Sequence, residues 1–91
     1  MFKTRVSCKG LSQDEGAPAP ADILEEFTHR PRDTNVRSGW DGGLLWLEAQ
    51  NYYDADGMAL LDEFSDAVVA CCSINGTISF AVESVREVTH G

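Results

Sequence analysis

Hydrophobic and polar residues alternate along residues 2–9, a pattern typical of a β-strand. Residues 36–40 and 44–51 are predicted to be two further strands, because they flank a Gly-Gly pair that predicts a tight hairpin turn. The register set by that turn places Arg37 opposite Glu48 as a cross-strand ion pair. We therefore predict a first strand that is followed, after a helix, by a two-stranded hairpin.

A second hairpin is predicted near the C-terminal end, where Asn75 and Gly76 separate two apolar runs within residues 67–88. Asn-Gly favours a two-residue type I′ turn because both central positions need a positive φ. In the resulting register, Val69 and Phe80 share a core face. The opposite face is smaller but still apolar, so it is either covered by the rest of the fold or offered to a partner.

The helical spacing of apolar residues predicts two helices. The first begins near Pro20 and ends before Pro31, and residues 10–20 are expected to form a mobile connection. Its apolar stripe consists of Ile23, Leu24 and Phe27. The second helix begins at Asp54 or Asp56, either of which is a suitable cap. Its apolar stripe consists of Met58, Leu60, Leu61 and Phe64.

The predicted order of elements is β-α-β-β-α-β-β. The first six match the ferredoxin-like plan, in which two helices cover one face of an antiparallel sheet. We therefore expect a single small α+β domain over residues 1–91, with an extra C-terminal strand at one edge of the sheet.

The net charge of −8 is distributed unevenly along the chain. Residues 1–40 sum to zero, whereas residues 41–91 contain nine acidic residues and only Arg86 as a base. This asymmetry argues against direct binding to nucleic acid or to an anionic membrane and favours a basic protein partner, although acidic residues also serve solubility alone.

The cysteines and the N-terminal sequence bear on the compartment. Cys71 and Cys72 are adjacent in a predicted strand and point to opposite faces, so they are poorly placed to form a disulfide or to share a metal. We interpret them, with Cys8, as reduced side chains of a cytoplasmic protein. The chain starts without an apolar leader, and no apolar run is long enough to predict a membrane span.

The strongest candidate for a binding surface is a set of acidic side chains around the second predicted helix. Its members are Glu48, Asp54, Asp56, Asp62, Glu63 and Asp66. Such a band imitates the charge of a nucleic acid backbone or steers a basic protein, and the alternative interpretation is a solvated helix surface. Asp54 and Asp56 also resemble the start of a calcium loop, but the third acidic position and the final glutamate are missing. We therefore expect helix capping there and no metal.

A second candidate is a cationic cluster at the end of the first predicted helix. Its members are His29, Arg30, Arg32 and Arg37. Arginine side chains bind phosphate or carboxylate. Cations at a helix C-terminus, however, also stabilise the helix alone, because they interact favourably with the partial negative charge of its dipole. A third candidate is a stacking platform of Trp40 and Trp46 with Tyr52 and Tyr53. Flanking acids and the lack of a basic, glycine and aromatic motif favour core packing or protein contact instead.

The sequence contains no nucleophile with a recognisable base, no phosphate loop and no cofactor motif. We therefore expect a non-enzymatic protein-interaction module that docks on a basic partner. By analogy of size and charge alone, this profile is typical of phage or mobile-element inhibitors of nucleic-acid-binding machines. The alternative is a homo-oligomeric domain that binds a small anion, or catalyses a reaction on it, through the cationic cluster. Its interface would be the apolar hairpin face or a strand edge.

Overall fold

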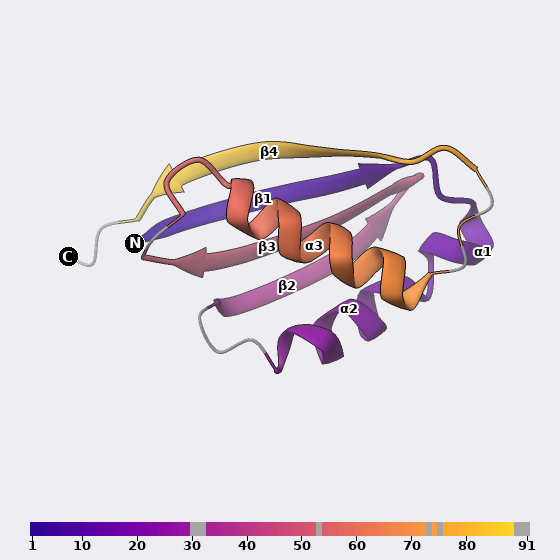
Figure 1. The fold of residues 1–91 in the computed structure, drawn as a ribbon, viewed down its shortest axis with the longest axis horizontal. Helices are drawn as coiled ribbons and strands as arrows, with labels where there is room; N and C mark the ends of the chain where they lie inside the picture. Colours follow the sequence, from indigo (N-terminus) through magenta and orange to yellow (C-terminus); the bar gives the residue numbers. More distant parts are fainter. Residues whose placement is uncertain (30–32, 53, 73, 75, 89–91) are drawn as a thin grey trace.

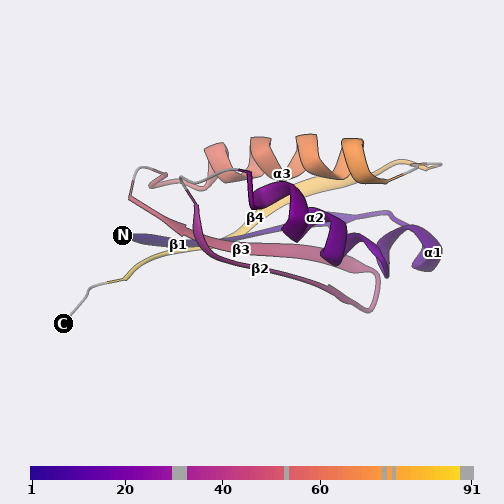
Figure 2. The same ribbon diagram turned by 90° about the horizontal axis from the view of Figure 1, so that it is seen from below.

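The chain forms a four-stranded antiparallel sheet with helices on one side of it (Figures 1 and 2). A computed structural model describes residues 1–29, 33–52, 54–72, 74 and 76–88. Along the chain the elements are β1 (Phe2–Lys9), α1 (Gln13–Gly16), α2 (Ala19–Phe27), β2 (Thr34–Asp41), β3 (Leu44–Asn51), α3 (Met58–Cys71) and β4 (Ser79–Glu87). The strand order is β2-β3-β1-β4, and this α+β architecture is compatible with a ferredoxin-like fold.

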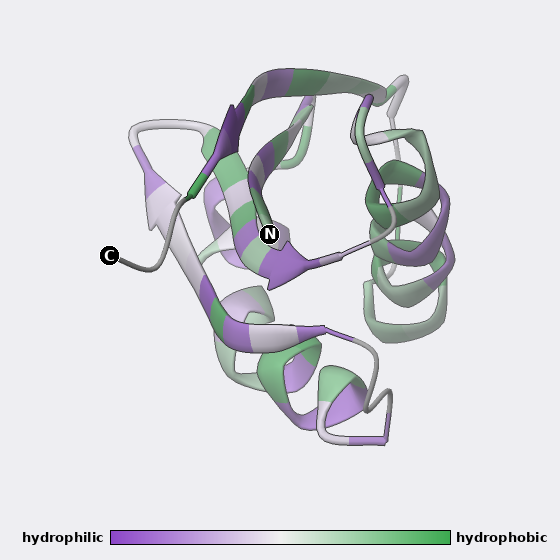
Figure 3. Ribbon diagram, turned by 90° about the vertical axis from the view of Figure 1, so that its left-hand side faces the viewer, coloured by the Kyte–Doolittle hydropathy of each residue, from purple (hydrophilic) through white to green (hydrophobic). Residues whose placement is uncertain are grey.

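Hydrophobic and hydrophilic residues follow one another along the strands (Figure 3), and burial alternates along most of β1 and β3. In β1, Thr4, Val6 and Cys8 are fully buried, whereas Lys3 and Arg5 are only partly covered. Ser7 is an exception, since it is buried and its hydroxyl donates to the Glu83 carboxylate. The central strand β3 pairs with β1 along its whole length, and both strands have their predicted bounds.

The core lies between the buried face of the sheet and the helices. Its buried hydrophobic residues are Val6, Cys8, Leu11, Ala19, Ile23, Phe27, Leu45, Leu47, Ala49, Leu60, Phe64, Ala67 and Val68. Phe64 of α3 meets Phe80 of β4 edge to face, with 5.9 Å between the ring centroids. Burying a side chain of this size stabilises the fold by about 1.5–3 kcal/mol, so these contacts hold α3 against the sheet. No helix in the described part of the chain is long and apolar enough to cross a membrane.

The hairpin of β2 and β3 has the register that its glycine turn predicts. Trp40 pairs with Leu45, and Arg37 pairs with Glu48. β2 begins at Thr34, two residues before the predicted start at Val36, because the pairing continues past an irregularity in the register. This hairpin fixes which side chains of β2 and β3 share a face.

The predicted C-terminal hairpin is wrong. Residues 67–71 continue α3, and β4 pairs antiparallel with β1 rather than with a strand just before it. A short continuous apolar run is compatible with either a strand or a buried helix. Here the run forms a further turn of α3, in which Ala67 and Val68 are buried. Val69, which was expected in the core, is 64% exposed. No fifth strand forms in residues 54–72, and Asn75 lies outside the described residues.

The segment before α2, expected to be a mobile connection, contains the short helix α1. The Ser12 hydroxyl accepts a hydrogen bond from the Glu15 N–H at 3.2 Å, and the Glu15 carboxylate accepts one from the Ser12 N–H at 2.8 Å. This reciprocal pair is a capping box, whose Ser-x-x-Glu signature is visible in the sequence. α2 then has Pro20 in its first turn and buries Ile23, both as predicted.

Candidate functional site

The predicted acidic residues of α3 lie in the middle of the helix. Asp62 and Asp66 are exposed and one turn apart, and Glu63 is half-buried. α3 continues to Cys71, so these acids lie more than one turn before its C-terminal end. The helix dipole, which disfavours acids in the last turn, therefore does not oppose them.

Asp54 has a structural role at the start of α3. The residue is 3% exposed, and its two carboxylate oxygens accept the N–H groups of Ala59 at 3.2 Å and Leu60 at 2.9 Å. The Asp56 carboxylate accepts the N–H of Met58 at 3.0 Å. Both acids therefore satisfy backbone donors of the first turn. The predicted cap position is wrong, however, because α3 begins at Met58 and its N-cap is Gly57 rather than either acid. Asp54 is too deeply buried to contact a partner.

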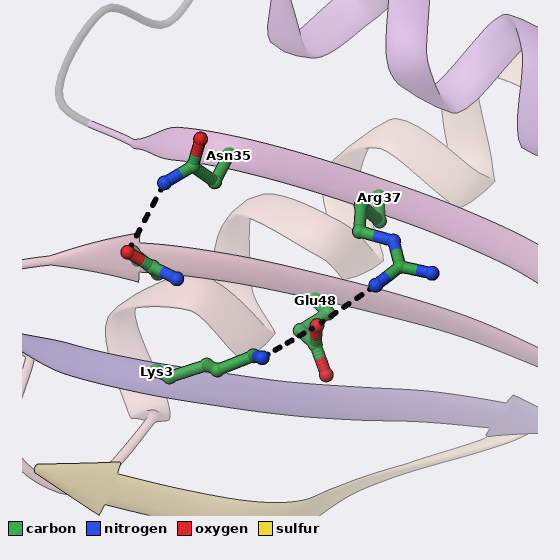
Figure 4. Close-up of polar contacts among 5 residues, drawn as sticks. Lys3, Asn35, Arg37 and Glu48 are labelled. Atoms are coloured by element: carbon green, nitrogen blue, oxygen red, sulfur yellow. Dashed lines mark hydrogen bonds and ion pairs between the residues drawn. The ribbon is translucent and has the colours of Figure 1, made fainter. Parts of the chain in front are cut away.

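Glu48 lies on the opposite side of the sheet from α3. Its side chain is 15% exposed, and its Oε1 atom is 3.4 Å from Nζ of Lys3 and 4.0 Å from Nη1 of Arg37 (Figure 4). The predicted Arg37–Glu48 pair is thus confirmed, and Lys3 extends it across three strands. The fold does not bring Glu48 together with the acids of the helices.

A second group of acids lies on α2 and is hidden when charge is summed along the first 40 residues. Asp22, Glu25 and Glu26, with His29 and Cys71, line a hollow of about 210 Å³ between α2 and the end of α3. Burial, and then these three carboxylates, raise the pKa of the Cys71 thiol. Together α2 and α3, hereafter the helix layer, contain six acids and no lysine or arginine.

The predicted cationic cluster is not assembled by the described residues. His29 lies on the helix side of the sheet, where it lines the acidic hollow. Arg37 lies on the other side, against Glu48. Arg30 and Arg32 are outside the described residues.

The sheet surface away from the helices, hereafter the open sheet face, gathers cations from three strands. Strand pairing places Arg86 opposite Lys3, and both Arg5 and Arg37 opposite Glu48, so these side chains project to one side. Every lysine and arginine that the structure describes lies on this face: Lys3, Arg5, Lys9, Arg37 and Arg86. Three acids lie on the same face: Glu48, Asp41, which pairs with Leu44, and Glu83, which accepts a hydrogen bond from the Ser7 hydroxyl. Among the described residues this face therefore has five cations against three acids, a positive balance opposite in sign to that of the helix layer.

The two tryptophans of the predicted stacking platform lie on opposite faces. Trp40 points to the helix side, where its indole N–H donates to Oε1 of Gln13 at 2.9 Å. Trp46 lies half-buried on the open sheet face, and the guanidinium carbon of Arg5 is 4.1 Å from its ring centroid. The ring rests on Gly39, where an added Cβ would come within 2.7 Å of the indole. Core packing thus explains Trp40 but leaves Trp46 at the surface.

The thiols offer no sign of metal or nucleophilic chemistry. In the described part of the chain, no group of three or more His, Cys, Asp or Glu residues could hold a metal ion. Cys8, Cys71 and Cys72 are free thiols. Burial, and then the proximity of Cys72, raise the pKa of Cys8 to about 11. These thiols are therefore protonated and weakly reactive near neutral pH.

Comparison with known protein families, with curated proteins and with solved structures finds no match for this chain. The charge and geometry of its two faces are therefore the features that bear on its function.

Proposed function

We propose that this protein is a non-enzymatic interaction module whose helix layer docks on a basic protein. The supporting observation is that α2 and α3 together have six acidic residues without a single lysine or arginine. A surface so rich in carboxylates attracts a cationic partner and orients the encounter.

The docking surface that we propose differs from the predicted set of acids in its membership. Asp56, Asp62, Glu63 and Asp66 remain in it, and the acids of α2 extend it. Asp54 is excluded because it is buried, with both carboxylate oxygens accepting N–H groups of α3. Glu48 is excluded because it pairs with cations on the opposite side of the sheet.

A protein that binds nucleic acid is the class of partner that suits such a surface. Carboxylates spaced along two helices present repeated negative charge, as a phosphate backbone does. The module would then compete with nucleic acid and inhibit its partner. We further propose a ferredoxin-like fold, which the element and strand orders support, and a cytoplasmic location, which the free thiols support.

The alternative function, a homo-oligomer with an anion site, has less support. The hairpin face proposed as its interface does not form, because residues 67–71 are helical. Two members of the anion cluster, His29 and Arg37, lie on opposite sides of the sheet. The edge strands β2 and β4 are the remaining route to self-association through the sheet.

The experiment that tests the proposal is a quantitative pull-down from host lysate, eluted along a salt gradient. The test variant carries Asp62→Lys and Asp66→Lys. The control variant carries Asp14→Lys and Glu87→Lys, which change the net charge equally at exposed positions outside α2 and α3.

We expect a basic nucleic-acid-binding protein to be retained by the natural chain and the control variant, and to be lost by the test variant. Retention by the test variant would contradict the proposal. So would equal loss in both variants, because net charge alone would then explain the binding.

A further inference from the structure

We infer that the open sheet face is a second binding surface, and that it takes a short segment of single-stranded nucleic acid. This inference concerns a different surface from the proposed protein-docking site and does not depend on it. It also departs from the expectation drawn from net charge, because the fold separates charges that are mixed along the sequence.

The cations of this face are positioned for a strand that crosses the sheet. Lys3 and Lys9 lie near opposite ends of β1, about 20 Å apart along the strand. Arg37 lies on β2 and Arg86 on the edge strand β4. Lys3 and Arg86 also line a shallow hollow of about 350 Å³ at one end of the face. Positive groups are therefore spread in both directions around the centre of the sheet.

The centre of the face provides a flat stacking surface. Trp46 lies on Gly39, and Arg5 stacks over the indole at 4.1 Å. Nucleobases stack both on aromatic rings and on guanidinium planes. The pair formed by Arg5 and Trp46 is thus able to hold a base while the surrounding cations contact phosphates.

A protein partner fits the same face less well. Protein interfaces depend on a few large apolar anchors. The most exposed large hydrophobic residues of the described chain are Tyr52, Met58 and Val69, which lie outside the strands. The open sheet face combines positive charge with a planar group, and a nucleic acid strand carries the complement of both.

Three acids on the open sheet face limit the strength of this surface. Glu48 pairs with Lys3 and Arg37, so it competes with phosphate for both cations. Asp41 and Glu83, on the same face, also repel a phosphate. The net charge of −8 also opposes a long polyanion. We therefore expect binding to short single strands, with a log–log salt slope of about −2 to −3, as for three or four phosphate contacts.

The experiment measures fluorescence anisotropy of a labelled oligouridylate or oligothymidylate of about eight nucleotides. Trp46→Leu and Arg5→Gln should each weaken binding by roughly tenfold, since both remove part of the stack. Quenching of Trp46 fluorescence in a Trp40→Phe background provides a second readout that reports stacking directly.

A matched pair of variants separates local from global charge. Glu48→Gln should strengthen binding about threefold, because it releases Lys3 and Arg37. Asp62→Asn removes the same charge from the helix layer and should leave the affinity nearly unchanged. This gain of binding does not depend on a destabilising substitution, so it tests the inference even if Trp46→Leu folds poorly.

Three results would overturn the inference. The first is no saturable binding by the natural chain or by Glu48→Gln. The second is equal binding of a duplex of the same length, or full competition by polyglutamate, which would indicate an acidic protein as the occupant. The third is an equal gain in affinity for the oligonucleotide from Glu48→Gln and Asp62→Asn, because net charge alone would then explain the gain.

Discussion

The helix layer and the open sheet face present opposite charges although a single sheet separates them. The two packed helices have six acids and no lysine or arginine, whereas all described cations project from the other side. On the cationic side, Glu48 is held between Lys3 and Arg37. On the acidic side, Asp62 and Asp66 are exposed in the middle of α3.

This difference shows that net charge is a poor guide to the partners of a small two-layer domain. The period of a strand places Lys3, Arg5 and Lys9 on one face of the sheet. The helices cover the opposite face and present their own polar residues outward. A chain with a strongly negative sum can therefore still display a positive surface.

The largest effect should come from the side chain that joins the helix layer to the sheet. Phe64→Ala is expected to lower the free energy of unfolding by about 3–5 kcal/mol, because it leaves a cavity under α3 and removes the edge-to-face contact with Phe80. Urea unfolding measures this loss. The control Met58→Ala, at a residue that is 51% exposed, should change stability by no more than about 0.5 kcal/mol. Equal losses would mean that α3 is not anchored through Phe64.

A second test uses pH, because burial in the core between the two faces raises the pKa of Cys8. Its pKa is about 11 in the folded chain and 9.0 ordinarily, so the folded state holds the thiol proton more tightly. The associated stability is complete below pH 9 and is lost as pH rises toward 11. A two-unit shift corresponds to about 3 kcal/mol. Unfolding measured at both pH values should show a smaller decline in Cys8→Ala than in the natural chain, and an identical decline would refute this burial effect.

On the open sheet face, Gly39→Ala is expected to cost about 1–3 kcal/mol, because the new methyl group would meet the Trp46 ring at 2.7 Å. The double variant with Trp46→Leu should recover part of that loss, since the smaller side chain removes the clash. A thermodynamic double-mutant cycle measures the coupling. Additive losses would show that the indole does not rest on Gly39.

The smallest effect distinguishes two acids on the helix side. Asp54→Ala should cost about 1–2 kcal/mol, because two backbone donors at the start of α3 lose their acceptor. Asp62→Ala should change stability by less than about 0.5 kcal/mol, since its side chain is exposed. Thermal unfolding of the two variants checks the difference. A costly Asp62→Ala would place that residue in the structural framework instead of the docking surface.

Much of the fold follows from local patterns that the sequence displays openly. The alternation in residues 2–9 predicted β1 with its bounds, and the glycine pair predicted the bounds of β3 and the pairing of Arg37 with Glu48. The N-cap itself is Gly57, but Asp54 and Asp56, short acids before an apolar stripe, do accept N–H groups at the start of α3. These features depend on neighbours in sequence or on one tight turn.

The errors arose where distant contacts decide the structure. Residues 67–71 are continuously apolar, so their hydrophobic periodicity does not distinguish a strand from a helix. Packing of Ala67 and Val68 against the sheet makes this segment helical. The site was harder still, because Glu48 is near the helix acids in sequence but on the other side of the sheet in space. Trp46 became a candidate only when strand pairing placed it beside Arg5 and Gly39.

The most direct test of the separation between the two faces is a crossed binding measurement. The helix-layer variant with Asp62→Lys and Asp66→Lys and the sheet variant Arg5→Gln are each titrated with the basic partner and with the single-stranded oligonucleotide. We predict that the helix-layer variant loses the partner but still binds the oligonucleotide, and that the sheet variant does the reverse. If both variants change both affinities in proportion to their net charge, the two faces do not act as separate binding surfaces.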